Sequence, residues 1–302
     1  MRNSTLVLPA TPPFNLYSVV HSHGWYQLAP FSFESGLLET MVQLQSGKVV
    51  RVAVRQEGEG VAAAVDGDPG VREIREVQSM ITWMMDLDLD LQEFYELAEE
   101  EPALKDVRAG AKGRLLRSPT VFEDVVKTIL TTNTSWAGTK RMVSNLVELY
   151  GEPMETVEGD QGPSAFPAAA ALASLSEEEL RTQARLGYRA PYVSGIARAE
   201  AEGELDLESL KHTDLDSADL YEFFLSLKGV GPYAAAHLIL LLGHYDRIPV
   251  DSWARKLVSV EWYDGEPVTE KEVQEKFAGW GKWKALAFWL WDWKHVQALQ
   301  DV

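Results

Sequence analysis

The chain has 302 residues, of which 46% are hydrophobic and 25% charged, so it is long enough for about two domains and is neither disordered nor fibrous. It has no cysteine, which excludes disulfides, thiolate zinc sites, cysteine nucleophiles and cysteine-ligated iron–sulfur clusters. With 46 Asp and Glu against 28 Lys and Arg, its formal charge is −18. That acidity argues against a partner as anionic as a nucleic acid.

The N-terminal segment MRNSTLVLPATPPF has no long apolar core followed by a small-residue cleavage site, so we expect no signal peptide. The strongest apolar run, 234–243, is shorter than the roughly 18 residues that a membrane-spanning helix needs. We therefore expect a soluble cytoplasmic protein with no membrane partner.

Short β-rich segments occupy residues 14–66. Residues 41–45 and 49–54 flank a Ser-Gly-Lys turn and predict an antiparallel hairpin, with an unpaired β-rich segment as the alternative. We expect a small antiparallel sheet that forms an N-terminal domain over 1–67. Its predicted strands are NLYSVV, LLETMVQLQ, VVRVAVRQ and VAAAV.

The pattern becomes helical after residue 67 and predicts a helical core over 68–302, of which 68–117 can pack with the sheet. Asp68 is the predicted N-cap of the first helix, with Pro69 at its first position. The chain is thus expected to be α+β and mostly α, with an exposed loop at 151–167. Helices are predicted over 86–101, 118–130, 135–150, 176–186, 191–201 and 217–227.

The segment LKGVGPYAAAH, residues 227–237, predicts a tight hairpin between two helices. Two glycines allow unusual backbone angles, and Pro232 suits the first position of the second helix. Such a hairpin presents backbone N–H groups that can bind a phosphate without many basic side chains. An ordinary corner between two helices is the alternative. The hairpin residues are Lys228, Gly229, Val230 and Gly231.

A lone carboxylate follows about twenty residues later, in the segment IPVDSWARK. Asp251 stands at the predicted start of a helix, where a plain N-cap is the alternative and is compatible with a chemical role. Together, the glycine hairpin and this Val-Asp pair resemble the signature of the helix-hairpin-helix (HhH-GPD) DNA glycosylase superfamily.

The resemblance covers most of the chain and is densest over 118–258. Residues 118–151, which include ILTTN, look like the first long helices of the family core, and LGYRAPYV at 186–193 is similar to a segment of the 8-oxoguanine glycosylases. The early sheet fits the N-terminal domain that those enzymes share with inducible bacterial 3-methyladenine glycosylases. The absence of cysteine places the chain outside the iron–sulfur branches.

The resemblance implies a role for each matched position. Asp251 would stabilise the positive charge that develops on the sugar, or help to activate water. Bifunctional family members carry a nucleophilic lysine where this chain has Tyr233, and tyrosine cannot form a Schiff base. A monofunctional enzyme without lyase activity is therefore expected; a packing role is the alternative for Tyr233.

Further matched positions concern the extruded base and the gap that it leaves. Asn133 and Arg189 match residues near the orphaned base in 8-oxoguanine enzymes, with a helix C-cap and a surface ion pair as the alternatives. Trp253, Trp136 and His237 are candidates for the base pocket with Tyr233. Most of the other tryptophans, and His237 itself, also suit plain core packing.

The expected function is a monofunctional base-excision-repair DNA glycosylase acting on a damaged purine, more readily an alkylated base than 8-oxoguanine or a deaminated base. The rival of another class is a non-catalytic binder of damaged or distorted DNA. The expected partner is double-stranded DNA with a damaged base, and no metal, nucleotide or other cofactor is expected. The cations expected to face DNA are Arg185, Arg189, Lys228, Arg247, Arg255, Lys256, Lys282 and Lys284.

Overall fold

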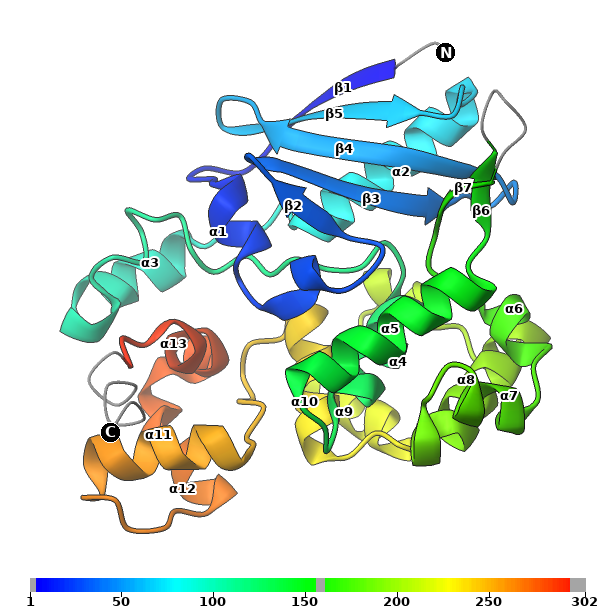
Figure 1. Cartoon of the computed structure of the whole chain (residues 1–302). Coiled ribbons are helices and arrows are strands. Elements are labelled where there is room, and N and C mark those ends of the chain that lie inside the picture. The colour runs from blue at the N-terminus through cyan, green and yellow to red at the C-terminus, as the bar shows by residue number, and fades with distance from the viewer. Residues whose placement is uncertain (1–3, 156–160, 294–302) are drawn as a thin grey trace. The chain divides into compact units, whose positions relative to one another are not determined.

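The computed structural model describes residues 4–155 and 161–293 (Figure 1). The chain divides into two compact units, each built from two separate segments. The first unit comprises residues 1–90 and 114–213, so it continues past residue 67 and contains helices as well as the sheet. The second comprises residues 91–113 and 214–302. The expected class, α+β and mostly α, is confirmed.

The first unit contains a five-stranded antiparallel sheet with the order β1-β5-β4-β3-β2. The predicted hairpin is confirmed, because β3 (Leu37–Gln43) pairs with β4 (Val49–Gln56) in a register that places Val42 opposite Val50. Val50, Val52 and Val54 alternate with more exposed residues along β4, so one face of the strand is buried. The other strands are β1 (Ser4–Pro9), β2 (Ser32–Glu34) and β5 (Gly60–Asp66).

Two predictions near the sheet are wrong. NLYSVV forms helix α1 (Leu16–Val20), because the Asn15 side chain accepts a hydrogen bond from Ser18 N at 3.0 Å and starts a helical turn. Helix α2 (Val71–Met85) begins after Gly70 and not at Asp68, whose φ of 51° is left-handed. The carboxylate of Glu73 accepts from Gly70 N at 2.7 Å and fixes this later start.

The predicted helix over 86–101 is also shorter than expected. Asp86 adopts a left-handed conformation that ends α2, and its carboxylate forms two hydrogen bonds with Arg117. Helix α3 (Gln92–Glu99) begins only after Leu91. Helix α4 (Val121–Thr131) has Thr120 as its N-cap, so it starts two residues after Pro119.

The predicted loop at 151–167 contains a small hairpin of β6 (Pro153–Glu155) and β7 (Gln161–Ser164). Residues 156–160 lie outside the described ranges. Helix α5 (Trp136–Tyr150) confirms its prediction, with Ser135 as N-cap and Gly151 as C-cap, whereas α7 (Glu177–Thr182) ends earlier than predicted. The remaining helices of this unit are η1 (Gly24–Gln27), α6 (Ala169–Ala173), η3 (Gly187–Arg189), α8 (Ala190–Glu202) and η4 (Glu208–His212).

The second unit is helical and has an aromatic core. The ring of Phe277 lies 5.6 Å from Trp262 and 5.3 Å from Trp291, centroid to centroid. Core packing is therefore the role of these C-terminal rings. No helix in the described ranges is long and apolar enough to cross a membrane. The helices are η2 (Pro102–Leu104), α9 (Ser217–Ser226), α10 (Pro232–Leu241), α11 (Ser252–Trp262), α12 (Glu270–Lys276), η5 (Ala278–Trp283) and α13 (Lys284–Leu290), besides α3.

Arg114 ties irregular segments of the first unit together. Its guanidinium is 1% exposed and donates to the carbonyl oxygens of Thr11 (2.5 Å), Pro13 (2.9 Å), Asp86 (3.0 Å) and Leu89 (2.6 Å). Buried loop carbonyls need such donors, because no helix or strand supplies one. One side chain thus replaces the backbone pairing that these segments lack.

We predict that Arg114→Leu lowers the free energy of unfolding by about 3–5 kcal/mol, because four part-buried carbonyl groups lose their donors. Urea unfolding followed by circular dichroism measures the effect. The control, Arg75→Leu, alters an exposed arginine of α2 and should change stability by less than about 0.5 kcal/mol. Equal effects of the two substitutions would contradict the role of Arg114.

Candidate active site

A tight glycine hairpin joins α9 to α10, as the sequence predicts. Gly229 has a φ of 93°, a conformation that favours glycine, and Val230 N donates to Leu227 O at 3.1 Å to close the turn. Val230 is 6% exposed and anchors the hairpin, whereas Lys228 is exposed. The four residues therefore divide into a buried anchor and a solvent-facing rim.

Neither the backbone conformation nor the packing at the N-terminus of α10 requires a glycine at position 231. Its φ of −97° is open to any residue, and a Cβ placed there would meet nothing within 4 Å. Its N–H finds no acceptor within the described residues. A glycine that is sterically unnecessary inside the protein suits close approach by an outside group, and a helix N-terminus favours an anion.

Asp251 is both an N-cap and an exposed carboxylate. Its Oδ1 accepts from Ala254 N at 2.7 Å at the start of α11, which leaves Oδ2 facing solvent. The approach to Asp251 is held by Gln274, whose side chain accepts from Ile248 N at 3.1 Å and donates to Ile248 O at 2.7 Å. The sequence analysis missed Gln274, because no local pattern links it to a segment 26 residues away.

A row of rings from α10 and α13 lies in the same unit as Asp251. Tyr233 and His237 are stacked with centroids 6.1 Å apart and planes 9° from parallel, and Trp289 lies 6.1 Å beyond His237. Burial, and to a lesser extent the charge of Asp251, raise the pKa of Tyr233 to about 12. Burial lowers the pKa of His237 to about 4. Both rings are therefore uncharged at neutral pH.

The two predicted tryptophans occupy different surroundings. Trp253 is half-buried in the second unit, two residues after Asp251, with the Lys256 ammonium 5.6 Å from its ring centroid. Trp136 belongs to the first unit, where its Nε1 donates to Gln27 Oε1 at 2.9 Å. A Cβ on Gly24 would lie only 2.5 Å from the Trp136 ring, so η1 packs directly against it.

The turn after α4 brings Asn133 and Arg189 together within the first unit. Asn133 is exposed with a left-handed φ of 48°, and the buried Arg189 donates to the carbonyl oxygens of Thr132 and Asn133. Arg189 thus holds the backbone of the turn through hydrogen bonds from the buried side of the turn. The guanidinium lies 4.4 Å from the ring centroid of Tyr188, which is 48% exposed and was not among the predicted site residues.

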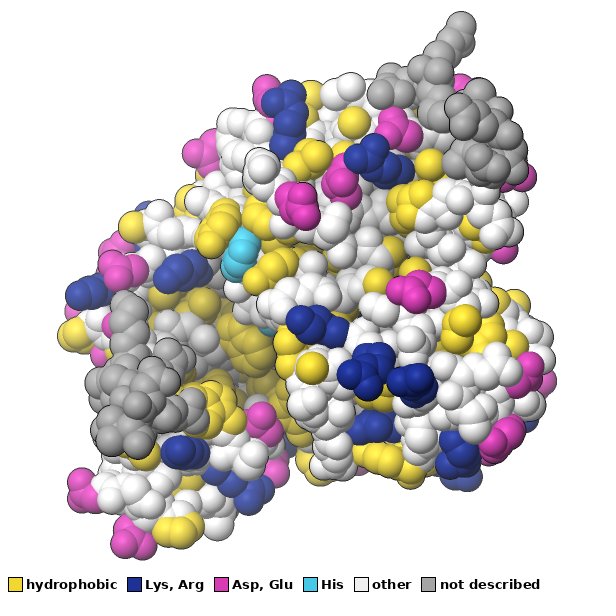
Figure 2. Space-filling view, in the orientation of Figure 1, with side chains coloured by type: hydrophobic (Ala, Val, Ile, Leu, Met, Phe, Trp, Pro, Cys, Tyr) yellow, Lys and Arg dark blue, Asp and Glu magenta, His cyan; other side chains and the backbone are white. Residues whose placement is uncertain are grey.

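The predicted basic residues also separate into groups. Arg185, Lys228, Arg255 and Lys256 are exposed and form no ion pair among the residues that the structure describes. Lys282, in contrast, pairs with Glu93 at 2.5 Å. On the first unit, Figure 2 shows Lys and Arg side chains gathered over α5, where Lys140 and Arg141 are exposed.

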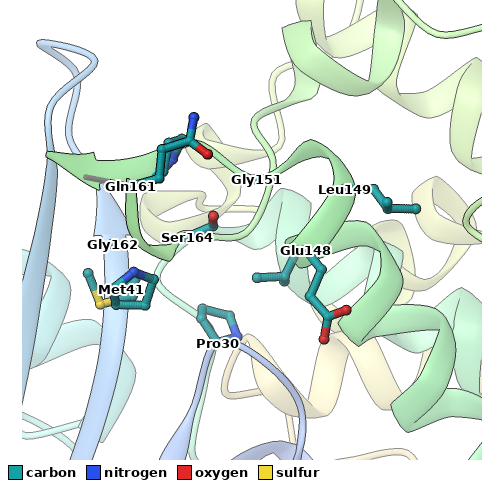
Figure 3. A pocket seen from close by; sticks show the side chains of 11 residues that line it. Pro30, Met41, Glu148, Leu149, Gly151, Gln161, Gly162 and Ser164 are labelled. Atoms are coloured by element: carbon teal, nitrogen blue, oxygen red, sulfur yellow. The ribbon is translucent and has the colours of Figure 1, made fainter. Parts of the chain in front are cut away.

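A cavity in the first unit is not a good base pocket. It has a volume of about 600 Å³ in the first unit and is lined by Pro30, Met41, Glu148, Gln161 and Ser164, among others (Figure 3). No aromatic ring is among its described lining residues, and Glu148 is their one ionisable group. Within the described ranges, no cluster of three or more His, Asp or Glu is arranged to hold a metal.

Comparison with known families shows which family the chain belongs to. The model of the HhH-GPD superfamily base excision DNA repair proteins matches residues 126–282, just over half of the chain. The chain belongs to this superfamily. The match includes the glycine hairpin, Asp251, Asn133 and Arg189. The expected family and the branch without an iron–sulfur cluster are confirmed.

Two curated relatives of this HhH-GPD protein have different activities in their names. A probable N-glycosylase/DNA lyase of Methanothermobacter thermautotrophicus is 28% identical over 61% of this chain and 63% of its own length. A DNA-3-methyladenine glycosylase of Bacillus subtilis is 27% identical over 72% of this chain and 71% of its own length. The chain thus spans less than two thirds of the first of these relatives.

Solved structures show the same fold. The 3-methyladenine DNA-glycosylase of Archaeoglobus fulgidus superposes with a TM-score of 0.74 at 23% identity, over 95% of this chain and 97% of that one. The Clostridium acetobutylicum 8-oxoguanine glycosylase/lyase superposes with a TM-score of 0.65 at 21% identity, over 88% and 99%. At these identities the likeness establishes the fold.

We predict that Gly231→Ala lowers the affinity for duplex DNA about tenfold, because a methyl group blocks the approach of a phosphate to the backbone. Its thermal melting should stay within about 2 °C of the wild type, since the Cβ meets no neighbour. Gly229→Ala is the contrasting variant: a left-handed alanine costs roughly 1 kcal/mol and should lower the melting temperature. Unchanged DNA affinity in Gly231→Ala would remove the hairpin from the interface.

The buried imidazole of His237 should make stability depend on pH. Its folded pKa of about 4 lies below the ordinary value of 6.5, so the unfolded chain binds an extra proton between these values. Stability therefore falls as pH drops through this window, by up to about 3 kcal/mol at its lower end. His237→Phe should remove this part of the slope in urea titrations from pH 7 to pH 4. An identical slope in both proteins would contradict it.

Proposed function

We propose that this HhH-GPD protein is a monofunctional DNA glycosylase that hydrolyses the N-glycosidic bond of an alkylated purine extruded from duplex DNA. The observation that carries the proposal is an exposed, rigidly held carboxylate, Asp251, in one unit with the uncharged rings of Tyr233 and His237. The names of the Bacillus and Archaeoglobus relatives agree with it.

The reaction breaks the C1′–N bond, and the bonding electron pair leaves with the base. The sugar gains positive charge in the transition state, which a nearby carboxylate stabilises. We assign this role to Oδ2 of Asp251, while Oδ1 is held by Ala254 N. A water molecule then bonds to C1′ and loses a proton, and Asp251 is the acceptor that we propose for it.

Uncharged aromatic rings favour an alkylated base over 8-oxoguanine. A purine alkylated at N3 or N7 is cationic, so it leaves as a neutral base without prior protonation, and it interacts favourably with ring faces. His237 would repel such a base if it were protonated, but its pKa of about 4 keeps it neutral. The structure contains no such reason to prefer neutral 8-oxoguanine or a deaminated base.

The residue at position 233 supports hydrolysis without lyase activity. A lyase needs an amine that forms a Schiff base with C1′, and tyrosine has none. The pKa of about 12 also keeps the Tyr233 hydroxyl protonated, so it is a poor nucleophile. The Methanothermobacter relative is named a lyase, so borohydride trapping on this chain is the decisive comparison.

The DNA partner that we propose is a duplex with a damaged base. The hairpin would bind a phosphate through Gly231 N–H, and Lys228 would add charge at its rim. Asn133 and Tyr188 would contact the bases beside the gap, with Arg189 as a positioning residue. A non-catalytic binder could use the same contacts, but it has no need for an exposed carboxylate near the sugar.

We predict that Asp251→Asn reduces excision of 3-methyladenine or 7-methylguanine at least a hundredfold, because the amide cannot stabilise a cationic sugar. Single-turnover assays measure abasic sites as alkali-labile strand breaks. DNA affinity should stay within about threefold, since asparagine also caps helices. The matched control is Asp264→Asn, which alters an exposed aspartate of the same unit and should retain full activity.

A panel of duplexes with single alkylated, oxidised or deaminated bases tests the substrate class. We expect abasic sites on alkylated purines and no borohydride-trapped adduct. Binding without excision on every duplex would establish the non-catalytic alternative. A trapped adduct would instead show that another lysine acts as nucleophile.

A further inference from the structure

The first unit carries a partly exposed strip of aromatic side chains far in sequence from the hairpin and Asp251. The strip consists of Tyr17, His21, Tyr26, Phe33 and Trp136. Tyr17 is 63% exposed and stacks on His21 at a centroid distance of 3.8 Å. The Tyr26 ring lies 4.6 Å from His21, and Phe33 lies 5.3 Å from it.

Polar side chains connect this strip to α5. Gln27 donates to the Tyr26 hydroxyl at 3.1 Å and accepts from Trp136 Nε1 at 2.9 Å. Below them, the buried Trp25 donates to Asp124 Oδ1 at 2.7 Å and fixes η1 on α4. The strip is therefore supported by tertiary contacts. One of its members, Trp136, lies three residues after the exposed Asn133.

The strip is formed by two segments that contain no Asp, Glu, Lys or Arg, in a chain that is highly charged. Residues 3–33 contain no Asp, Glu, Lys or Arg, nor do residues 128–139, although one residue in four is charged overall. These two segments meet where Trp136 packs against Gly24. Figure 2 shows, over the α1 region, a histidine surrounded by hydrophobic and other uncharged side chains.

Two basic side chains directly follow the segment 128–139, which contains no Asp, Glu, Lys or Arg. Lys140 lies four residues after Trp136 in α5, on the same helix face, and Arg141 follows it; both are exposed. Neither forms an ion pair within the described residues, in a chain with 46 carboxylates. An aromatic strip from two segments without carboxylates, followed in α5 by cations without a described ion pair, complements a partner with ring faces and a negative backbone.

We infer that the strip is a stacking surface for DNA whose bases are unstacked beside the lesion. A closed duplex hides its base faces, whereas extrusion of a nucleotide opens the stack around it. Stacking of a base on an aromatic side chain tolerates any sequence, as a repair enzyme requires. This inference rests on the proposed function, and it assigns to the strip the preference for distorted over intact DNA.

Fluorescence anisotropy with the full chain and two labelled duplexes tests the inference. One duplex is intact and the other contains a tetrahydrofuran abasic-site analogue, so no base is available for excision. We expect Tyr17→Ser to weaken binding to the abasic duplex about tenfold and to the intact duplex less than twofold. Tyr17→Phe, which keeps the ring, should bind both duplexes as the wild type does.

Two further variants separate stacking from charge and from folding. Lys140→Gln should weaken binding to both duplexes equally and reduce the salt slope by about one. Leu149→Ser alters a side chain that is 52% exposed at the far end of α5 and should change neither affinity. Tyr26→Leu repeats the loss of a ring if Tyr17→Ser does not fold.

The outcomes distinguish this inference from the proposed function. Unchanged affinities in both Tyr17→Ser and Tyr26→Leu would overturn the inference, as would an equal loss on the two duplexes. A protein partner on the strip would give the first of these results. Failure of the glycosylase proposal shows differently, as absent excision by the wild type, and leaves the abasic-duplex measurement intact.

Discussion

Coulomb repulsion between a chain of charge −18 and the phosphates of DNA is the constraint that the rest of the structure must satisfy. An excess of basic side chains does not offset this repulsion, because the chain has 46 Asp and Glu against 28 Lys and Arg. In our proposal, the hairpin at Gly231 would use backbone N–H groups and a helix N-terminus, which attract an anion without a net charge. In the first unit, the two segments that form the strip contain no carboxylates, and Lys140 and Arg141 have no ion pair among the described residues. Local charge, and not the total, therefore sets which surfaces can meet DNA.

The position of Asp251 at the start of α11 meets a second requirement, that of an exposed carboxylate with a fixed orientation. A carboxylate in this role must be exposed, yet fixed in orientation. The N-cap position meets both needs, because Ala254 N and the positive end of α11 hold one oxygen while the other faces solvent. The hydrogen bonds from Gln274 to Ile248 hold the chain just before this point. The N-cap that the structure shows is thus compatible with the catalytic role that we propose for Asp251.

Local patterns predicted much of the fold, because they depend on short-range chemistry. The β3–β4 hairpin, α5 with its two caps, and the glycine turn before α10 all follow from residues that lie within a few positions of one another. The errors occurred where a single side-chain hydrogen bond, and not the propensity of the segment, sets the boundary. Asn15 turns a β-rich segment into α1, and Glu73 moves the start of α2 from Asp68 to Gly70. Propensity alone does not contain this information.

The candidate site was less predictable, because its support comes from tertiary contacts. Arg189 matches a family position near the orphaned base, yet burial beneath the Asn133 turn makes it a support and leaves Tyr188 as the exposed neighbour. Burial also decides the charge of His237, which a sequence pattern leaves open. In the function that we propose, a protonated imidazole would repel a cationic base, so the desolvation that keeps His237 neutral would favour such a base. The apolar environment of α10 would thus affect both the choice of base and the pH dependence of stability, because both depend on the protonation of the same buried ring.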